Sequence, residues 1–220
     1  MENEALQVFD ILGRRYTLPV LENRSPTKER ILMTTTILFG RKGYEAVSMR
    51  EIAKAVNIKG SSIYNHYKNK EALLTAILEH LKKLYVIYFE HVSHDLAQAN
   101  TFKDKLSVLF YEPKRLNNHF TSYGYSMIMR EQVQNPLVAD TFNFFMVHGL
   151  KIIKDCFDDC VTLGLVPAFD TYSVALLILN TVFLGITAEV QNYEGRGVLY
   201  QPNTMFANME RFFLEVLTRK

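Results

Sequence analysis

The sequence has few of the residues on which several common protein classes depend. Among 220 residues there are two cysteines, six prolines and no tryptophan. Two cysteines cannot make a disulfide framework, and Cys156 and Cys160 lie only four residues apart. The acidic start, MENEALQVFD, lacks the basic segment and apolar core of a signal peptide. We therefore expect a reduced, cytoplasmic protein.

Turn signals that separate alternating strands are also missing. No Asn-Gly or Asp-Gly dipeptide is present, and glycine and proline fall at the ends of segments with helical periodicity. This pattern predicts an all-α fold. Residues 1–24 are ambiguous, because ALQVFDILGRRY is open to interpretation as an extra short helix, and TLPVLENRS reads as a linker.

Charge is absent from residues 171–188, a segment nearly long enough to cross a membrane. However, it contains Asn180, Ser173 and three threonines, and it stands alone. A helix that is apolar nearly all round also suits burial between its own core and a partner subunit. We favour that interpretation, which predicts no membrane span.

Positive charge is concentrated near the N-terminus. The net charge of the chain is +2, but residues 26–70 hold nine Lys and Arg against three Glu, so the remainder is mildly acidic. A basic module joined to an acidic remainder indicates a polyanion contact confined to one end of the chain.

The basic segment carries signals for three consecutive helices. Ser25-Pro26 opens the first helix and Gly43 ends it. Ser48 and Glu51 form a capping box at the start of SMREIAKAV. A second short helix, SSIYNHY, follows a tight turn, and Asn69 then caps a long amphipathic helix. This order of elements is the helix-turn-helix arrangement.

The second short helix of such a unit enters the major groove of DNA. Serine and asparagine hydrogen-bond base edges, whereas tyrosine, histidine and lysine suit phosphate oxygens. Ile63 and Tyr67 are four residues apart and are expected to face the core, which leaves Ser61, Ser62, Tyr64 and Asn65 outward.

The stretch KGYEAVSMREIAKAVNIKGSSIYNHYKNKEALL resembles the N-terminal domain of the tetracycline-repressor (TetR) family of bacterial regulators. The positions that match in order and spacing are Gly43-Tyr44, Ser48, Ile52-Ala53, Ile63-Tyr64, His66-Tyr67 and Lys70. The resemblance implies an N-terminal extension over 1–24, a three-helix DNA-binding domain over 25–70, and a helical ligand-binding and dimerisation domain over 71–220.

By position, the resemblance implies base-edge contacts from Arg50, Ser61, Ser62 and Asn65, and phosphate contacts from Tyr64, His66 and Lys70. The full set of candidate DNA-binding residues is Thr27, Ser48, Arg50, Ser61, Ser62, Tyr64, Asn65, His66 and Lys70. Gly60 departs from the pattern, because a longer polar side chain often begins the recognition helix in this family. Two readings stay open: Arg50 can instead pair with Glu45 or Glu51, and the lysines at 54, 59 and 68 can be solvated charges.

The last two helices have more apolar surface than one small bundle needs, and the resemblance implies that they form a four-helix interface with a second copy. The candidate interface residues are Leu177, Thr181, Leu184, Phe206, Met209 and Phe213. The alternative is that both helices complete the core of a monomer.

The middle of the chain is rich in aromatic residues and methionine, which suits a mostly apolar pocket. In the family this domain binds a small inducer, so we expect a small, largely apolar or aromatic effector. The candidate ligand-binding residues are Phe89, Phe120, Tyr123, Met127, Phe145 and His148.

No group of residues indicates enzyme chemistry, because no set of nucleophile, base and acid stands out. A metal site could use Cys156, Asp159, Cys160 and His148, but the second cysteine pair of a structural zinc site is missing. We expect no metal and no cofactor. The sequence predicts a homodimeric repressor that binds a palindromic operator in double-stranded DNA and is released by an effector. A non-inducible DNA-binding or adaptor protein, and a transcriptional activator, are the alternatives.

Overall fold

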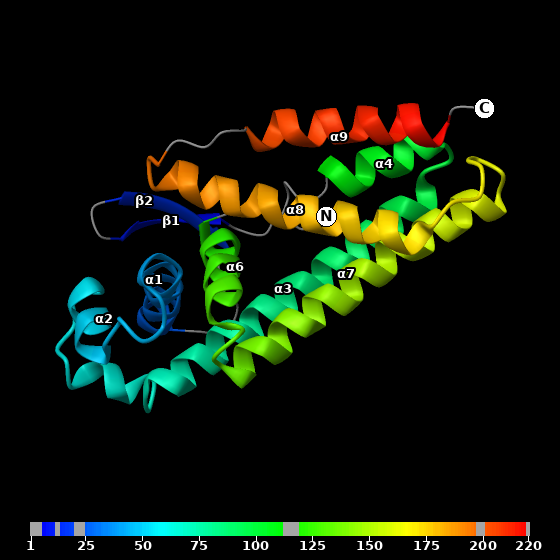
Figure 1. Ribbon diagram of the computed structural model, residues 1–220. Helices are drawn as coiled ribbons and strands as arrows, with labels where there is room; N and C mark the ends of the chain where they lie inside the picture. The colour runs from blue at the N-terminus through cyan, green and yellow to red at the C-terminus, as the bar shows by residue number, and fades with distance from the viewer. Residues whose placement is uncertain (1–5, 12–13, 20–24, 112–118, 197–200, 219–220) are drawn as a thin grey trace. The chain divides into compact units, whose positions relative to one another are not determined.

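The computed structural model describes residues 6–11, 14–19, 25–111, 119–196 and 201–218. These residues form helices and one β-hairpin (Figure 1). In chain order the elements are β1 Leu6–Ile11, β2 Arg14–Pro19, α1 Pro26–Lys42, α2 Met49–Ala55, the 3₁₀ helix η1 Ser62–Asn65, α3 Lys70–Gln98, α4 Phe102–Tyr111, α6 His119–Glu131, α7 Pro136–Thr162, α8 Thr171–Tyr193 and α9 Pro202–Leu217. Apart from this N-terminal hairpin the described elements are helices, so the predicted all-α class is confirmed for the helix-turn-helix unit and the helical domain that follows it.

The helical interpretation of the N-terminal extension is wrong. β1 and β2 pair antiparallel, from Leu6 opposite Pro19 to Ile11 opposite Arg14. Both strands contain residues that favour extended backbone, including Val8, Phe9 and Tyr16. The reading of TLPVLENRS as a linker is also wrong for its first three residues, which belong to β2, and residues 20–24 lie outside the described residues.

The chain divides into two compact units. Unit 1 comprises Met1–Lys82 with Asn118–Phe142, and unit 2 comprises Lys83–Asn117 with Asn143–Lys220. The helices α3 and α7 each belong partly to both units and are continuous across the division. These units are defined by how compactly the residues pack, not by what they do. The expected boundary after residue 70, between a DNA-binding domain and a ligand-binding and dimerisation domain, therefore stays a prediction.

The core of unit 1 is built around α1, in which every residue from Ile31 to Gly40 is buried. Its partner is α6, and Gly40 allows the two helices to come close. A Cβ atom at Gly40 would lie 2.5 Å from the carbonyl oxygen of Tyr123 on α6. Glycine is therefore required here by the approach of a neighbouring backbone.

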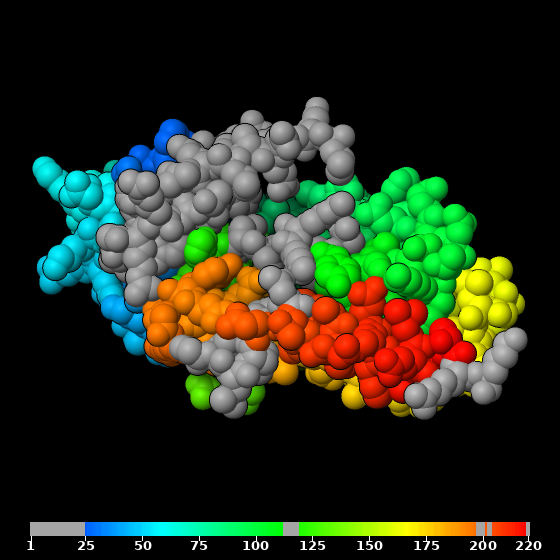
Figure 2. Space-filling model, turned by 90° about the horizontal axis from the view of Figure 1, so that it is seen from above, coloured from blue at the N-terminus to red at the C-terminus, as the bar shows by residue number. Residues whose placement is uncertain are grey.

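The core of unit 2 lies among α4, α7, α8, α9 and the C-terminal part of α3. The helices α4 and α9 lie side by side in both views (Figures 1 and 2), and Phe110 stacks on Phe213 with ring centroids 6.0 Å apart. Phe206, also on α9, packs on the same Phe110 ring with centroids 6.3 Å apart. It fits against α8 because Gly185 leaves room: a Cβ there would lie 2.5 Å from the Phe206 ring.

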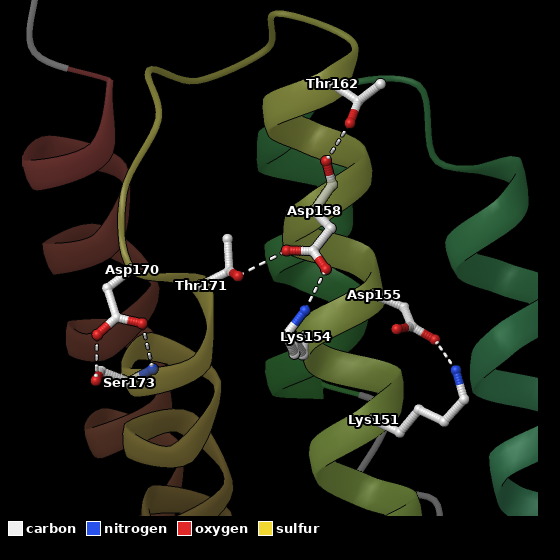
Figure 3. Close-up of polar contacts among 8 residues, drawn as sticks. All are labelled: Lys151, Lys154, Asp155, Asp158, Thr162, Asp170, Thr171 and Ser173. Atoms are coloured by element: carbon white, nitrogen blue, oxygen red, sulfur yellow. Dashed lines mark hydrogen bonds and ion pairs between the residues drawn. The ribbon is translucent and has the colours of Figure 1, made fainter.

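Polar contacts fix the passage from α7 to α8 (Figure 3). The Asp158 carboxylate accepts hydrogen bonds from Lys154 one turn earlier and from the Thr171 hydroxyl at the start of α8. Asp170 caps α8 by accepting from the backbone N–H of Ser173 at 3.1 Å. The first turn of α8 is therefore held against the end of α7.

Among the described helices, α8 alone is long and apolar enough to cross a membrane, with a mean hydropathy of 1.9. A single such helix is weak support for a span, because a core helix has the same composition. Its inward residues Ala175, Ile178 and Leu179 belong to the core of unit 2.

Candidate nucleic-acid interface and effector cavity

The turn of the helix-turn-helix is made by Asn57. This residue has a φ of 56°, a left-handed conformation that asparagine tolerates at the end of a helix. The Ile58 N–H then donates to the Ala53 carbonyl at 3.0 Å, and the Asn57 N–H donates to the Lys54 carbonyl at 3.2 Å. These two bonds end α2 and turn the chain toward η1.

The start of α2 is capped as predicted, with one difference. The Ser48 hydroxyl accepts a hydrogen bond from the Glu51 N–H at 3.2 Å. The Glu51 carboxylate does not complete the box but forms an ion pair with Lys42 at the end of α1. Glu51 is therefore engaged, and Arg50 has no ion-pair partner in the part of the chain that the structure describes.

The segment expected as a second short α-helix is a 3₁₀ helix of four residues, Ser62–Asn65. Its bonds span three residues, as from the His66 N–H to the Ile63 carbonyl at 3.0 Å. Ile63 is fully buried and Tyr67 is 6% exposed, so the predicted inward face is confirmed. Lys28 of α1 lies over the Tyr67 ring, 5.4 Å from its centroid.

The outward face of this unit presents polar groups. Ser61 and Asn65 are exposed, Tyr64 is 55% exposed, and Ser62 and His66 are half-buried. A shallow depression adjoins this face, and Arg50 and Lys54 give it positive charge. It is lined by Arg50, Ala53, Lys54, Asn57, Ile58, Gly60, Ser61 and Tyr64. Hydroxyl, amide and cationic groups thus gather on one open surface.

The three other candidate DNA-binding residues are in more restricted places. Thr27 is half-buried in the first turn of α1, and the Ser48 side chain is used as a cap. The Lys70 ammonium donates to the Tyr44 carbonyl at 3.0 Å and lies 4.1 Å from the centre of the Tyr44 ring. Lys70 therefore ties the start of α3 to the segment that follows α1.

Unit 2 contains an apolar cavity of about 60 Å³. It is lined by Tyr85, Tyr88, Phe89, Val92, Leu109, Phe145, Gly149, Ile152, Ile153, Leu179, Val182, Phe183 and Ile186. Four of the six ligand candidates do not line it: Phe120, Tyr123 and Met127 are buried in unit 1, and His148 is exposed beside Phe89 and Phe144. Only Phe89 and Phe145 of the candidates line the cavity. Helical periodicity identifies the inward side chains of α6 but not whether they pack in unit 1 or in unit 2, so no sequence signal distinguishes these cases.

Some of the candidate dimer residues are exposed and others are buried in the chain's own core. Leu177 and Leu184 are 58% and 47% exposed on one face of α8, with Thr181 half-buried between them. On α9, Phe206 and Phe213 are buried in the core of their own unit, so they are not available to a partner. Met209 is half-buried, and the large apolar side chains that α9 exposes are Phe212 and Val216.

The two cysteines are buried next to each other on α7. Their mutual hydrogen bond, together with burial, raises the pKa of the Cys156 thiol, so this group stays protonated at neutral pH. Within the described residues, no three His, Cys, Asp or Glu side chains are grouped so that they could hold a metal ion.

The geometry defines a class of protein: a helix-turn-helix unit followed by a helical body. A family model described as bacterial regulatory proteins, tetR family, matches residues 31–77. The HTH-type transcriptional regulator UidR of Escherichia coli (strain K12) is 38% identical over 171 residues, which cover 76% of this chain and 82% of UidR. The chain belongs to the TetR family of transcriptional regulators, and these relatives are regulators, not enzymes.

Other curated relatives match over a smaller part of their length. The uncharacterized HTH-type transcriptional regulator YvkB of Bacillus subtilis (strain 168) is 30% identical over 117 residues, which cover 46% of this chain and 62% of YvkB.

Solved structures share the fold. Salmonella enterica GusR has a TM-score of 0.62 at 21% identity, covering 90% of this chain and 98% of GusR. AibR in complex with isovaleryl coenzyme A and operator DNA has a TM-score of 0.63 at 22% identity, over 84% and 97% of the two chains. A regulator from Saccharomonospora viridis in complex with choline reaches 0.68 at 18% identity, over 90% and 100%. These likenesses agree with an N-terminal helix-turn-helix unit and a C-terminal helical domain.

Proposed function

We propose that this protein is a cytoplasmic, homodimeric repressor that binds a palindromic operator and is released by a small, largely apolar or aromatic effector. The observation that carries the proposal is the open face of the helix-turn-helix unit. There, Ser61 and Asn65 stand exposed beside Arg50 and Lys54. Such groups read base edges and neutralise phosphates. The AibR complex, which has the same fold, contains operator DNA.

The roles of the candidate residues follow from their placement. Ser61, Asn65 and Arg50 are exposed and are assigned to base edges, with Ser62 half-buried next to them. Tyr64 and His66 are assigned to phosphates. Thr27, Ser48 and Lys70 also stay assigned to the DNA surface, but Ser48 and Lys70 act mainly by holding α2 and α3 in place.

The proposed dimer surface is the outer face of α8 and α9. Leu177 and Leu184 on α8, and Phe212 and Val216 on α9, are each about half exposed in the single chain. Exposed apolar side chains on two adjacent helices are typical of an interface that buries them against a second copy. Two-fold pairing also places two recognition segments on successive major grooves.

The proposed effector site is the apolar cavity of unit 2. An effector alters DNA affinity only by binding two conformations of the protein with different affinity. Since α3 runs without a break from the helix-turn-helix unit to residues that line the cavity, bending or tilting of α3 is the proposed link. Coupling of about 1–3 kcal/mol is typical and corresponds to roughly 5- to 150-fold in affinity.

The experiment that tests this function is selection of DNA by the purified protein from random and genomic fragments. The selected sites should be two-fold symmetric, with half-sites about one helical turn apart. Affinity should fall as salt rises, and Arg50→Ala should weaken binding at least tenfold. Lys103→Ala removes an exposed positive charge on α4, outside both proposed surfaces, and should not weaken binding in this way. Failure to enrich any sequence would contradict the proposal.

A further inference from the structure

The lining of the effector cavity carries no carboxylate, ammonium, guanidinium or imidazole group. Of its thirteen residues, only Tyr85 and Tyr88 bear a polar side-chain group, and all others are aliphatic, phenylalanine or glycine. An isolated charge in such surroundings is strongly destabilised, because no counter-ion replaces its hydration. The cavity is therefore unsuited to carboxylates, phosphates and ammonium groups.

Tyr85 has the more restricted environment of the two. Its side chain is 5% exposed, and its ring stacks on Phe145 with centroids 4.0 Å apart and an interplanar angle of 23°. Phe89 also packs on it, at 5.9 Å. These contacts hold the phenol ring in one orientation in the wall of the cavity.

The Tyr85 hydroxyl has no hydrogen-bond partner among the described residues. Tyr85 lines the cavity, so a hydroxyl without a protein partner there keeps its hydrogen-bonding capacity for a bound molecule. Burial also raises the pKa of Tyr85, so the group is a neutral phenol that donates or accepts a hydrogen bond.

We propose that the Tyr85 hydroxyl is the polar anchor of the effector site, and that the effector is an uncharged molecule carrying a hydrogen-bonding group on an apolar ring. The proposal rests on the function proposed above, because it concerns the effector of that regulator. Phe145 and Phe89 position the anchor, and the aliphatic wall from α7 and α8 contacts the remainder of the molecule.

The size of the cavity sets the scale of the ligand. Sites for drug-sized ligands typically measure about 300–1,000 Å³. A cavity of about 60 Å³ is much smaller, which favours a compact molecule of one ring, or the polar end of a longer molecule for which the side chains move apart.

Four single-ring or similarly small probes test the proposal on the full-length protein by isothermal titration: phenol, toluene, benzoate and tetramethylammonium. Phenol and toluene match in size and differ in the hydroxyl. We expect phenol to bind roughly two- to tenfold more tightly than toluene, which is the range of one hydrogen bond. Benzoate and tetramethylammonium should bind much more weakly than phenol, or not at all.

The decisive variant is Tyr85→Phe, in which the preference for phenol over toluene should fall to about one while toluene binding persists. Tyr172→Phe on the exposed start of α8 is the matched control and should keep the preference. Preference retained in Tyr85→Phe, charged probes that bind as tightly as phenol, or no binding by any probe would each overturn the proposal.

The comparison of phenol with toluene in the unaltered protein needs no variant, so it decides the matter even if Tyr85→Phe fails to fold. None of these titrations requires DNA. A protein that recognises phenol through Tyr85 but selects no operator would disprove the repressor function and leave the anchor intact.

Discussion

The carboxylate of Glu131, in the last turn of α6, accepts a hydrogen bond from the backbone N–H of Tyr44 at 3.0 Å. The two residues are 87 positions apart, and Tyr44 follows the glycine that ends α1. Beside them, the Arg130 guanidinium donates to the Arg41 carbonyl at 3.4 Å. The end of α6 therefore supplies the partners that the end of α1 lacks, and it fixes the segment from which α2 begins.

Replacing Glu131 with alanine should lower the free energy of unfolding by about 1.5–3 kcal/mol, the range for a hydrogen bond to a charged group. Urea unfolding followed by circular dichroism measures this change. Glu90→Ala, at an exposed position of α3, is the control and should change it by less than about 0.5 kcal/mol. Equal effects of the two substitutions would show that the Glu131 contact contributes nothing.

Two glycine-to-alanine substitutions should have opposite effects. Gly40→Ala places a methyl group 2.5 Å from the Tyr123 carbonyl oxygen, so we expect a loss of about 1–3 kcal/mol. At Gly60 a Cβ atom meets nothing within 4 Å, so Gly60→Ala should leave stability unchanged or raise it by up to about 1 kcal/mol. Urea unfolding of the two variants gives the comparison. A stable Gly40→Ala protein would mean that α1 and α6 are not closely packed.

The neighbouring residues Phe212 and Phe213 allow the proposed interface and the core to be tested separately, because Phe212 is exposed and Phe213 is buried. Phe213 is 3% exposed, so Phe213→Ala should cost about 3–5 kcal/mol in stability. Phe212 is 53% exposed in the single chain, so Phe212→Ala should affect dimer affinity far more than the stability of the fold. Thermal unfolding at several protein concentrations distinguishes the two effects, since only a dimer gives a concentration-dependent midpoint.

A charge on the outer face of α8 should separate the subunits. Leu184→Lys would bury an unpaired ammonium in the proposed interface, so we expect a monomer by analytical ultracentrifugation at micromolar concentration. Val147→Lys on α7 is the control: Val147 is 63% exposed and outside that face, so the variant should keep the oligomeric state of the natural chain. A dimer that survives Leu184→Lys would exclude this part of α8 from the interface.

Stability should decrease in acid through Asp158. The hydrogen bond from Lys154, followed by that from Thr171, lowers the pKa of the Asp158 carboxyl. Its contribution is therefore present above the ordinary Asp pKa of about 3.9 and is lost as pH falls through the lowered value. Asp158→Asn should be less stable than the natural protein at pH 7, and the difference should shrink below about pH 4. Thr171→Val should retain part of this pH dependence, because Lys154 still pairs with Asp158.

The sequence predicted what depends on local chemistry. Helix starts at Ser25, Ser48 and Asn69 follow from side chains that bond a nearby N–H, and the inward positions of Ile63 and Tyr67 follow from spacing alone. It did not predict features that depend on contacts between separate segments. The N-terminal hairpin is one of them, because each strand is stabilised by pairing with the other.

The same limit applies to sites. Phe206 and Phe213 looked suited to an interface because they are large and apolar, but which side of an amphipathic helix faces its own core depends on α4 and α8. Tyr123 on α6 was assigned to the effector pocket, although Gly40 of α1 determines where that helix packs. Tyr85 is an ordinary apolar-face residue by spacing, and only its unpartnered hydroxyl reveals a role.

Unit 1 is built from two separate segments of the chain. Residues 1–82 form the first, and residues 118–142 complete the unit after residues 83–117, which belong to unit 2. A fragment that stops after α3 would expose the face of α1 that α6 covers, and such a piece should aggregate. In a chimeric regulator, the helix-turn-helix unit of a relative should therefore fold only if the segment equivalent to α6 is transferred together with the segment equivalent to residues 1–82.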